Sequence, residues 1–173
     1  MQSRVQKVLL FSFLIGVFPA SFELHASEKT ECYQSLVSRI ATEYKVSPNL
    51  VMAIIEAESR GDAAAVSSQG ALGVMQLMPS TAHKFGVVDP FDPEENITGG
   101  VRYLRYLMGF FGQNLKLVLS AYHVGHNKVR RNMEMPTNVV TQGYVHQVLS
   151  LYNELQKRQT PVASVSDWRV EWF

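Results

Sequence analysis

Apolar residues recur at helical spacing through almost the whole chain of 173 residues. Between Asp92 and Gly112 the large apolar side chains fall three or four residues apart, at Ile97, Val101, Leu104, Leu107, Met108 and Phe111. A period of about 3.6 residues is that of an amphipathic α-helix. Alternation with a period of two, which is typical of strands, is confined to Trp168, Val170 and Trp172. The pattern therefore predicts one domain that is almost entirely α-helical.

Local start and stop signals divide this domain into helices. Ser47-Pro48 is typical of an N-cap followed by proline in the first turn, and Asp92-Pro93-Glu94-Glu95 has the spacing of a capping box. Asn114 is expected to cap a further helix that Gly125 ends. Helices are expected over about 33–44, 47–61, 78–86, 92–111, 114–125 and 143–157.

The two ends of the chain differ from the domain, which we expect over residues 33–158. Residues 1–26 have two basic residues, an apolar run and a small-residue exit at Ala26, the layout of a secretory signal peptide cleaved after Ala26. An uncleaved membrane anchor is the alternative, but the run over 8–18 is shorter than the roughly 20 residues that span a bilayer. The tail over 159–173 is expected to be short and irregular apart from its aromatic strand pattern. Its aromatic residues either fold back onto the domain or dock a partner.

Charge and cysteine content exclude some classes of partner and bond. The first 26 residues carry two of the 16 basic and one of the 15 acidic residues, so the exported chain would be neutral. Proteins that bind nucleic acid usually carry a basic excess, so we expect no nucleic-acid partner. Cys32 is the only cysteine, which leaves no intramolecular disulfide, even in the periplasm where export would place the chain. We interpret Cys32 as a tolerated thiol near a frayed end, with pairing to another protein as the alternative.

Glu58 is the carboxylate that the pattern marks most strongly as functional. Val51, Ile54 and Ile55 precede it by seven, four and three residues and so share its face of the expected helix. Apolar surroundings disfavour the ionised form, so the pKa of Glu58 should rise until it holds a proton near neutral pH, as a general acid must. A structural carboxylate that accepts backbone hydrogen bonds is the alternative. Glu56 lies about 200° round the same helix, and we expect it to be solvated.

Several motifs follow Glu58 in an order that resembles a known family. Glu58-Ser59, Ser67, Gly73-Val74-Met75-Gln76 and Met78-Pro79-Ser80-Thr81-Ala82 are similar to the catalytic segment of the soluble lytic transglycosylase family. Asn96-Ile97, Gly100, Tyr103-Leu104, Ala121-Tyr122-His123 and Tyr144-Val145 resemble its later motifs. The match covers about residues 36–155 and implies a lysozyme-like fold.

The resemblance implies a role for each matching position. Glu58 would be the sole catalytic acid and base, and the Tyr122 hydroxyl would orient its carboxyl. The saccharide would be bound by Ser59, Ser67, Met75, Gln76, Met78, His123 and Tyr144. Core packing is the alternative for Met75, Met78 and Tyr144, and bracing of a loop is the alternative for Gln76. His123 stands where the family usually has asparagine, and an imidazole differs from an amide in size and possible charge.

The same resemblance implies non-hydrolytic cleavage between N-acetylmuramic acid and N-acetylglucosamine, giving 1,6-anhydro ends on peptidoglycan glycan strands. No metal or cofactor is expected, and the chain is expected to act as a monomer. Two alternatives stay open: a muramidase in which water attacks, and a non-catalytic peptidoglycan-binding assembly factor. Local opening of the wall for a secretion, pilus or conjugation machine and general turnover of the wall also stay open.

Overall fold

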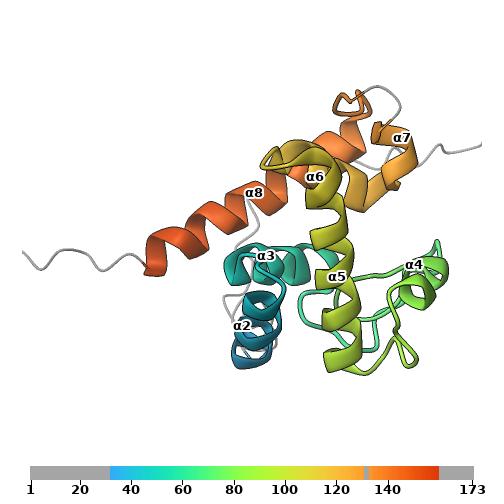
Figure 1. Ribbon diagram of the computed structural model, residues 1–173, viewed down its shortest axis with the longest axis vertical. Coiled ribbons are helices and arrows are strands. Elements are labelled where there is room, and N and C mark those ends of the chain that lie inside the picture. Colours follow the sequence, from blue (N-terminus) through green and yellow to red (C-terminus); the bar gives the residue numbers. More distant parts are fainter. Residues whose placement is uncertain (1–31, 131–132, 160–173) are drawn as a thin grey trace, which may run out of the picture.

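The computed structural model describes residues 32–130 and 133–159 and, within them, shows seven helices (Figure 1). They are α2 (Gln34–Glu43), α3 (Pro48–Ser59), α4 (Pro79–Lys84), α5 (Pro93–Phe111), α6 (Leu115–Val124), α7 (His126–Arg130) and α8 (Val139–Gln159). Isolated antiparallel bridges join Val66 to Leu72 and Leu72 to Leu77 in the loop between α3 and α4. The all-α expectation is confirmed for the part of the chain that the structure describes.

Helix α5 forms the centre of the arrangement. In Figure 1 it stands upright, with α2 and α3 on one side, α4 on the other, and α6 and α7 at its upper end. Its apolar stripe is buried as the spacing predicted, with Ile97, Val101, Leu104 and Leu107 inaccessible to solvent. Helix α8 packs along both α3 and α6. The core therefore holds α3 in place from two sides, through α2 and through α8.

The helix starts follow the local signals, with two differences in detail. Ser47 occupies the N-cap position of α3, but its side chain makes no capping hydrogen bond. Asp92 caps α5 by accepting from the Glu95 N–H at 2.8 Å. The carboxylate of Glu95, however, accepts from the N–H groups of Val88 and Asp89, at 2.7 and 2.9 Å, and thus braces the loop before the helix. The reciprocal half of the expected capping box is therefore replaced by a loop contact.

The last helix begins earlier than expected, and one helix was missed. Helix α8 starts at Val139, about a turn before Gly143, because the Asn138 side chain accepts from the Thr141 N–H at 2.8 Å. Helix α7 has only five residues, too few to show a helical period in the sequence. Both differences lie on the side of the domain where α6, α7 and α8 meet.

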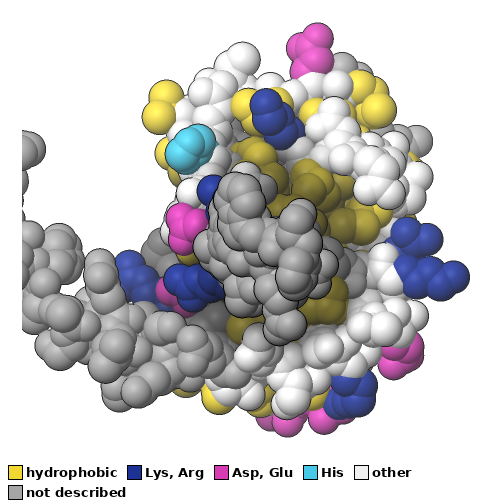
Figure 2. All heavy atoms as spheres, turned by 90° about the vertical axis from the view of Figure 1, so that its left-hand side faces the viewer, with side chains coloured by type: hydrophobic (Ala, Val, Ile, Leu, Met, Phe, Trp, Pro, Cys, Tyr) yellow, Lys and Arg dark blue, Asp and Glu magenta, His cyan; other side chains and the backbone are white. Residues whose placement is uncertain are grey.

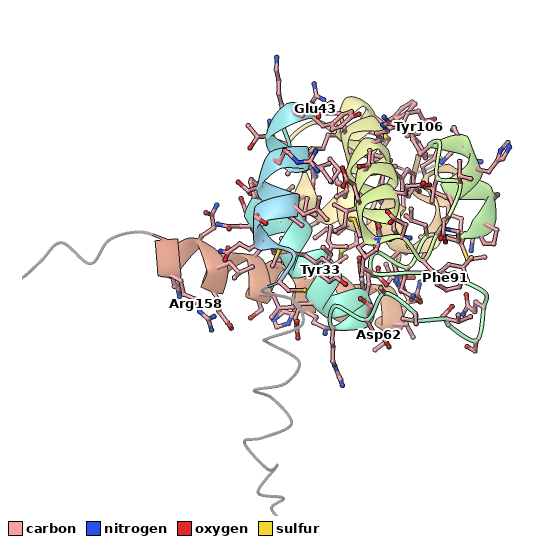
Figure 3. All side chains as sticks on the ribbon, turned by 90° about the horizontal axis from the view of Figure 1, so that it is seen from below. Tyr33, Glu43, Asp62, Phe91, Tyr106 and Arg158 are labelled. Atoms are coloured by element: carbon pink, nitrogen blue, oxygen red, sulfur yellow. The ribbon has the colours of Figure 1, made fainter. Side chains whose placement is uncertain are left out.

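The expected signal peptide, residues 1–26, and the aromatic tail over 160–173 lie outside the described residues. Cys32 is described and lies exposed. Within 32–130 and 133–159, no helix combines the length and the apolar character needed to cross a membrane. On the face seen in Figure 2, Lys and Arg side chains are interspersed with Asp and Glu side chains. Seen from below in Figure 3, Arg158 lies on the end of α8 that extends away from the other helices.

Candidate functional site

A cleft of about 720 Å³ lies where the loop after α3 faces the starts of α4, α7 and α8. The loop begins near Asp62, which Figure 3 labels beside the end of α3. The cleft is lined by Glu58, Ser67, Ser68, Gln69, Ala71, Gln76, Leu77, Met78, Ser80, Thr81, Tyr103, Tyr122, His123, Val124, Gly125, Lys128, Asn138, Val140 and Thr141. The structure thus brings together residues from positions 58 to 141. Among these lining residues, only Glu58 carries a carboxyl group.

Glu58 lies in the last turn of α3, at the floor of the cleft. Its face of the helix is formed by Val51, Ile54 and Ile55, each fully buried. Burial raises the pKa of Glu58 from 4.5 to about 7, while the nearby Tyr144 hydroxyl opposes this rise. The raised pKa agrees with the expectation from helical spacing. At neutral pH a carboxyl with this pKa is present in both its protonated and its ionised form.

Glu56 is partly exposed, in the same class of exposure as Glu58. It is not among the residues that line the cleft. The expected separation of the two glutamates therefore holds for the cleft, and solvation of the Glu56 carboxyl stays a prediction.

Two tyrosines lie behind the Glu58 carboxyl, and their contacts differ from the expected roles. The Tyr122 hydroxyl donates to the Met75 carbonyl at 2.8 Å, so its proton is used in a hydrogen bond to the loop. Tyr144 is buried, and its hydroxyl makes no hydrogen bond of good geometry among the described residues. It nevertheless acts on Glu58 as a donor would, since it lowers the pKa of that carboxyl. Of the two hydroxyls, that of Tyr144 lowers the pKa of Glu58 and that of Tyr122 binds the Met75 carbonyl, while the charge of Glu58 acts on both tyrosines. Tyr144 does not line the cleft.

Asn96 holds the loop that carries Met75 and Gln76. Its amide oxygen accepts from the Met75 N–H at 2.8 Å, and its amide nitrogen donates to the carbonyls of Leu72 and Pro90 at 3.1 and 2.9 Å. Asn96 is completely buried, so these bonds satisfy an amide that would otherwise be costly to bury. One side chain from α5 therefore fixes the loop across from Glu58.

Ser59 and Met75 were expected to bind the saccharide, but their side chains help to fix this loop instead. Ser59 donates from its hydroxyl to the Val74 carbonyl at 2.8 Å and accepts from the Gly61 N–H, so it ties α3 to the loop. The Met75 side chain is fully buried against Gly100. Neither residue lines the cleft. Both are needed for the shape of the loop, which explains their place beside cleft residues in the motifs.

Ser67, Gln76 and Met78 do line the cleft, as expected. The Gln76 amide nitrogen donates to the carbonyls of Ala65 and Gly73 at 3.1 and 2.9 Å, so the loop-bracing alternative holds for this atom. Gln76 has a positive φ of 47°, a conformation that costs roughly 1–2 kcal/mol for a residue with a side chain. Met78 is 43% exposed, which contradicts core packing and leaves its side chain open to the cleft.

His123 lies on the wall of the cleft and stacks on the ring of Tyr144. The ring centroids are 4.4 Å apart and the planes are inclined by 18°. Partial burial lowers the pKa of His123 below its usual value of 6.5, so the imidazole is neutral at pH 7. A neutral ring keeps one donor and one acceptor, as an amide does. The stacking also supports the tyrosine whose hydroxyl acts on Glu58.

Lys128, Asn138 and Thr141 are among the cleft residues that were not predicted from the sequence. Lys128 and Asn138 lie in short segments without periodic signals, and their place in the cleft depends on how α7 and α8 pack. Thr141 is almost fully buried, and its hydroxyl makes no hydrogen bond within the described residues. The spacing of Asn138 and Thr141 is that of an N-cap and its third helical residue, the one signal that could have placed this end of α8.

Replacing the Tyr144 hydroxyl should raise the pKa of Glu58. In Tyr144→Phe the carboxyl loses the group that opposes burial, so its pKa should move above 7. Titration of the glutamate carboxyl by 13C NMR measures this directly, without an activity assay. Tyr122→Phe is the matched control, because that hydroxyl is bonded to the Met75 carbonyl and should leave the Glu58 pKa near 7. A downward or absent shift in Tyr144→Phe would contradict the contact.

Comparison with known proteins agrees with the motifs. A family model described as the transglycosylase SLT domain matches residues 35–144. The chain is 33% identical over 128 residues to a transglycosylase of Enterobacteria phage PRD1, which covers 74% of this chain and 46% of the phage protein. It is 34% identical over 113 residues to membrane-bound lytic murein transglycosylase F of Desulfosudis oleivorans, covering 62% of this chain and 25% of that protein.

Solved structures agree in fold as well. The 70 kDa soluble lytic transglycosylase of Escherichia coli superimposes with a TM-score of 0.65 at 30% identity, covering 72% of this chain and 24% of that one. The chain therefore spans from about a quarter to less than half of these relatives. The expected lysozyme-like all-α fold is confirmed. The match over 35–144 and these relatives show that the chain belongs to the soluble lytic transglycosylase family.

Proposed function

We propose that this protein is a peptidoglycan lytic transglycosylase that cleaves the β-1,4 bond between N-acetylmuramic acid and N-acetylglucosamine. The observation that carries the proposal is Glu58, the one carboxyl among the residues that line the cleft of about 720 Å³, with a pKa of about 7. Most glycosidases use two carboxyl groups on either side of the bond. Here no second carboxyl lines the described cleft, which favours a reaction in which one group acts twice.

In the first step, protonated Glu58 gives its proton to the glycosidic oxygen, and the bond from that oxygen to the muramic C1 breaks. Positive charge develops at C1, and the acetamido oxygen of the same sugar can stabilise it. A pKa near the working pH suits this transfer, because the acid must be protonated and still able to release its proton. The buried carboxyl of Glu58 meets that requirement without a charged partner among the residues that line the cleft.

In the second step, ionised Glu58 takes the proton of the C6 hydroxyl, whose oxygen then bonds to C1. The sugar closes to the 1,6-anhydro form, Glu58 regains its proton, and no water is consumed. Tyr144 supports this step, because a donor on the carboxylate stabilises the ionised form between the two transfers. His123 would contact the substrate as a neutral group, in place of the amide that the family usually has.

The product of purified protein acting on intact sacculi tests this proposal. We expect mass spectrometry to show muropeptides ending in 1,6-anhydro-N-acetylmuramic acid. Reducing ends would instead indicate a muramidase in which water attacks C1. Binding to sacculi without soluble product would indicate a non-catalytic assembly factor.

We further propose export to the periplasm, where the substrate lies, supported by the signal-peptide pattern over 1–26. Service to a secretion, pilus or conjugation machine through the tail at 159–173 stays a prediction.

A further inference from the structure

One face of α8 carries a groove of about 470 Å³ that is separate from the cleft. It is lined by Val145 and Leu149 of α8, by Met135 from the segment before that helix, and by Lys116 at the start of α6. No described residue lines both this groove and the cleft. An occupant of the groove would therefore leave the cleft open.

The groove follows the helical repeat of α8. Its lining residues recur over 142–153 at intervals of three or four positions, so they form one stripe along about 16 Å of the helix. Val145 is buried and Leu149 is partly buried, whereas Lys116 and His146 at the edges are exposed. No acidic side chain lines the groove. Its chemistry therefore suits a short apolar segment that is flanked by negative charge.

The tail over 160–173, which lies outside the described residues, has this chemistry in its sequence. Trp168, Val170 and Trp172 fall on one side of its strand pattern, and the acidic Asp167 and Glu171 fall on the other. Two residues along a strand advance about 6.6 Å, close to the roughly 6 Å that four residues advance along a helix. Successive apolar side chains of the tail therefore match successive turns of the groove.

The tail is also long enough to reach the groove. Helix α8 ends at Gln159, and Pro161 follows as a residue that cannot continue the helix. From Gln159 back to Leu149 the distance along the helix is about 15 Å. The nine residues from Gln159 to Trp168 span up to about 30 Å when extended. A segment tethered in this way has a roughly millimolar effective concentration at the groove, so even weak complementarity keeps it bound.

We propose that the tail over 160–173 folds back along α8 and binds in this groove, with its two tryptophans packed over Val145 and Leu149. Docking covers the apolar side of the tail and the apolar floor of the groove together, and large exposed apolar patches are uncommon on monomers. Lys116 and His146 then face the acidic residues of the tail. The inference does not depend on the proposed function, because the groove and the cleft share no residue.

Tryptophan fluorescence of the whole protein tests the docking, because both tryptophans of the chain lie in the tail. We expect the folded protein to emit at shorter wavelength than the protein unfolded in urea, at every protein concentration. The double variant Lys116→Glu/His146→Glu places negative charge beside the acidic tail residues, so its emission should shift toward the unfolded value and its quenching by acrylamide should rise. Gln147→Glu/Lys157→Glu is the matched control, since both residues are exposed and lie outside the groove, and its emission should not change.

A methyl signal locates the tail. An indole packed in the groove shifts the methyl resonance of Met135 by its ring current. We therefore expect this signal to move in Trp168→Ala/Trp172→Ala, measured in the full chain with 13C-labelled methionine. Met78, which lines the cleft, is the internal control, and its methyl signal should stay in place.

Three results would overturn the proposal. Emission of the folded wild type at the unfolded value would mean that the tail is not docked. A short-wavelength emission that is lost on dilution would mean that the tail binds a second copy of the chain. A short-wavelength emission that neither charge reversal nor the Met135 signal reports would mean that the tail binds elsewhere. None of these measurements uses activity, so their failure leaves the proposed function untouched.

Discussion

Glu58→Gln should lower the release of soluble products from sacculi by at least about 10³-fold. The amide keeps the shape of the carboxyl but can neither give a proton to the glycosidic oxygen nor take one from the C6 hydroxyl. Glu56→Gln is the matched control on the same helix, and it should keep most of its activity because Glu56 does not line the cleft. Full activity in a folded Glu58→Gln protein would contradict the assignment of the acid.

The same variant should be more stable than the wild type at pH 8. Glu58 has a pKa of about 7 when folded and 4.5 as a model group, so the folded state holds its proton more tightly. Its contribution to stability is full below about pH 4.5 and is lost as the pH rises through 7, a change of about 3 kcal/mol. Glutamine does not ionise and escapes this loss. Thermal unfolding at pH 4 and pH 8 should therefore show a gain for Glu58→Gln at pH 8 only, which also verifies its folding.

Gly73→Ala should destabilise the domain by about 4 kcal/mol. Gly73 has a φ of +75°, and an added Cβ would lie 2.2 Å from the Pro90 carbonyl oxygen and 2.4 Å from the Asn96 amide nitrogen. Neither neighbour can give way cheaply, because one is backbone and the other holds the loop through three hydrogen bonds. Urea unfolding measures the loss.

Gly70→Ala is the control for this variant. It lies in the same loop, with a φ of +83°, but an added Cβ would meet no atom within 4 Å. Only the backbone conformation is strained, at a cost of about 1 kcal/mol. If Gly73→Ala costs no more than Gly70→Ala, the close packing of the loop on Asn96 does not determine its stability.

Much of the fold could be predicted from the sequence, because the signals for helices are local. Asp92 and Asn114 cap helices through bonds to residues three positions on, and these bonds need no tertiary contact. The start of α8 was misplaced although Asn138 provides the same kind of local cap. Val139 and Val140 are 81% and 72% exposed, so the apolar periodicity of this helix begins only after its first turn.

The place of Glu58 in the site could be predicted for the same local reason, since Val51, Ile54 and Ile55 belong to the same helix. The contacts of the two tyrosines could not. Which hydroxyl acts on Glu58 depends on the packing of α6 and α8 around α3. The motifs contain both Tyr122 and Tyr144, and they do not indicate which of the two affects the pKa of Glu58. Ser59 and Met75 lie in the motifs because they shape the loop, and sequence reasoning alone does not separate that role from substrate contact.

Helix α3 runs toward the cleft, so Glu58 lies in its last turn. The peptide dipoles of a helix leave partial negative charge at its C-terminal end, which disfavours a nearby carboxylate by about 0.3–1 kcal/mol. The direction of the chain thus favours the protonated form of Glu58 in addition to burial. Burial already raises the pKa of Glu58 to about 7 with the cleft empty, and the dipole, which is part of the backbone, acts in the same direction. Between turnovers both effects therefore favour the protonated acid that the first step needs.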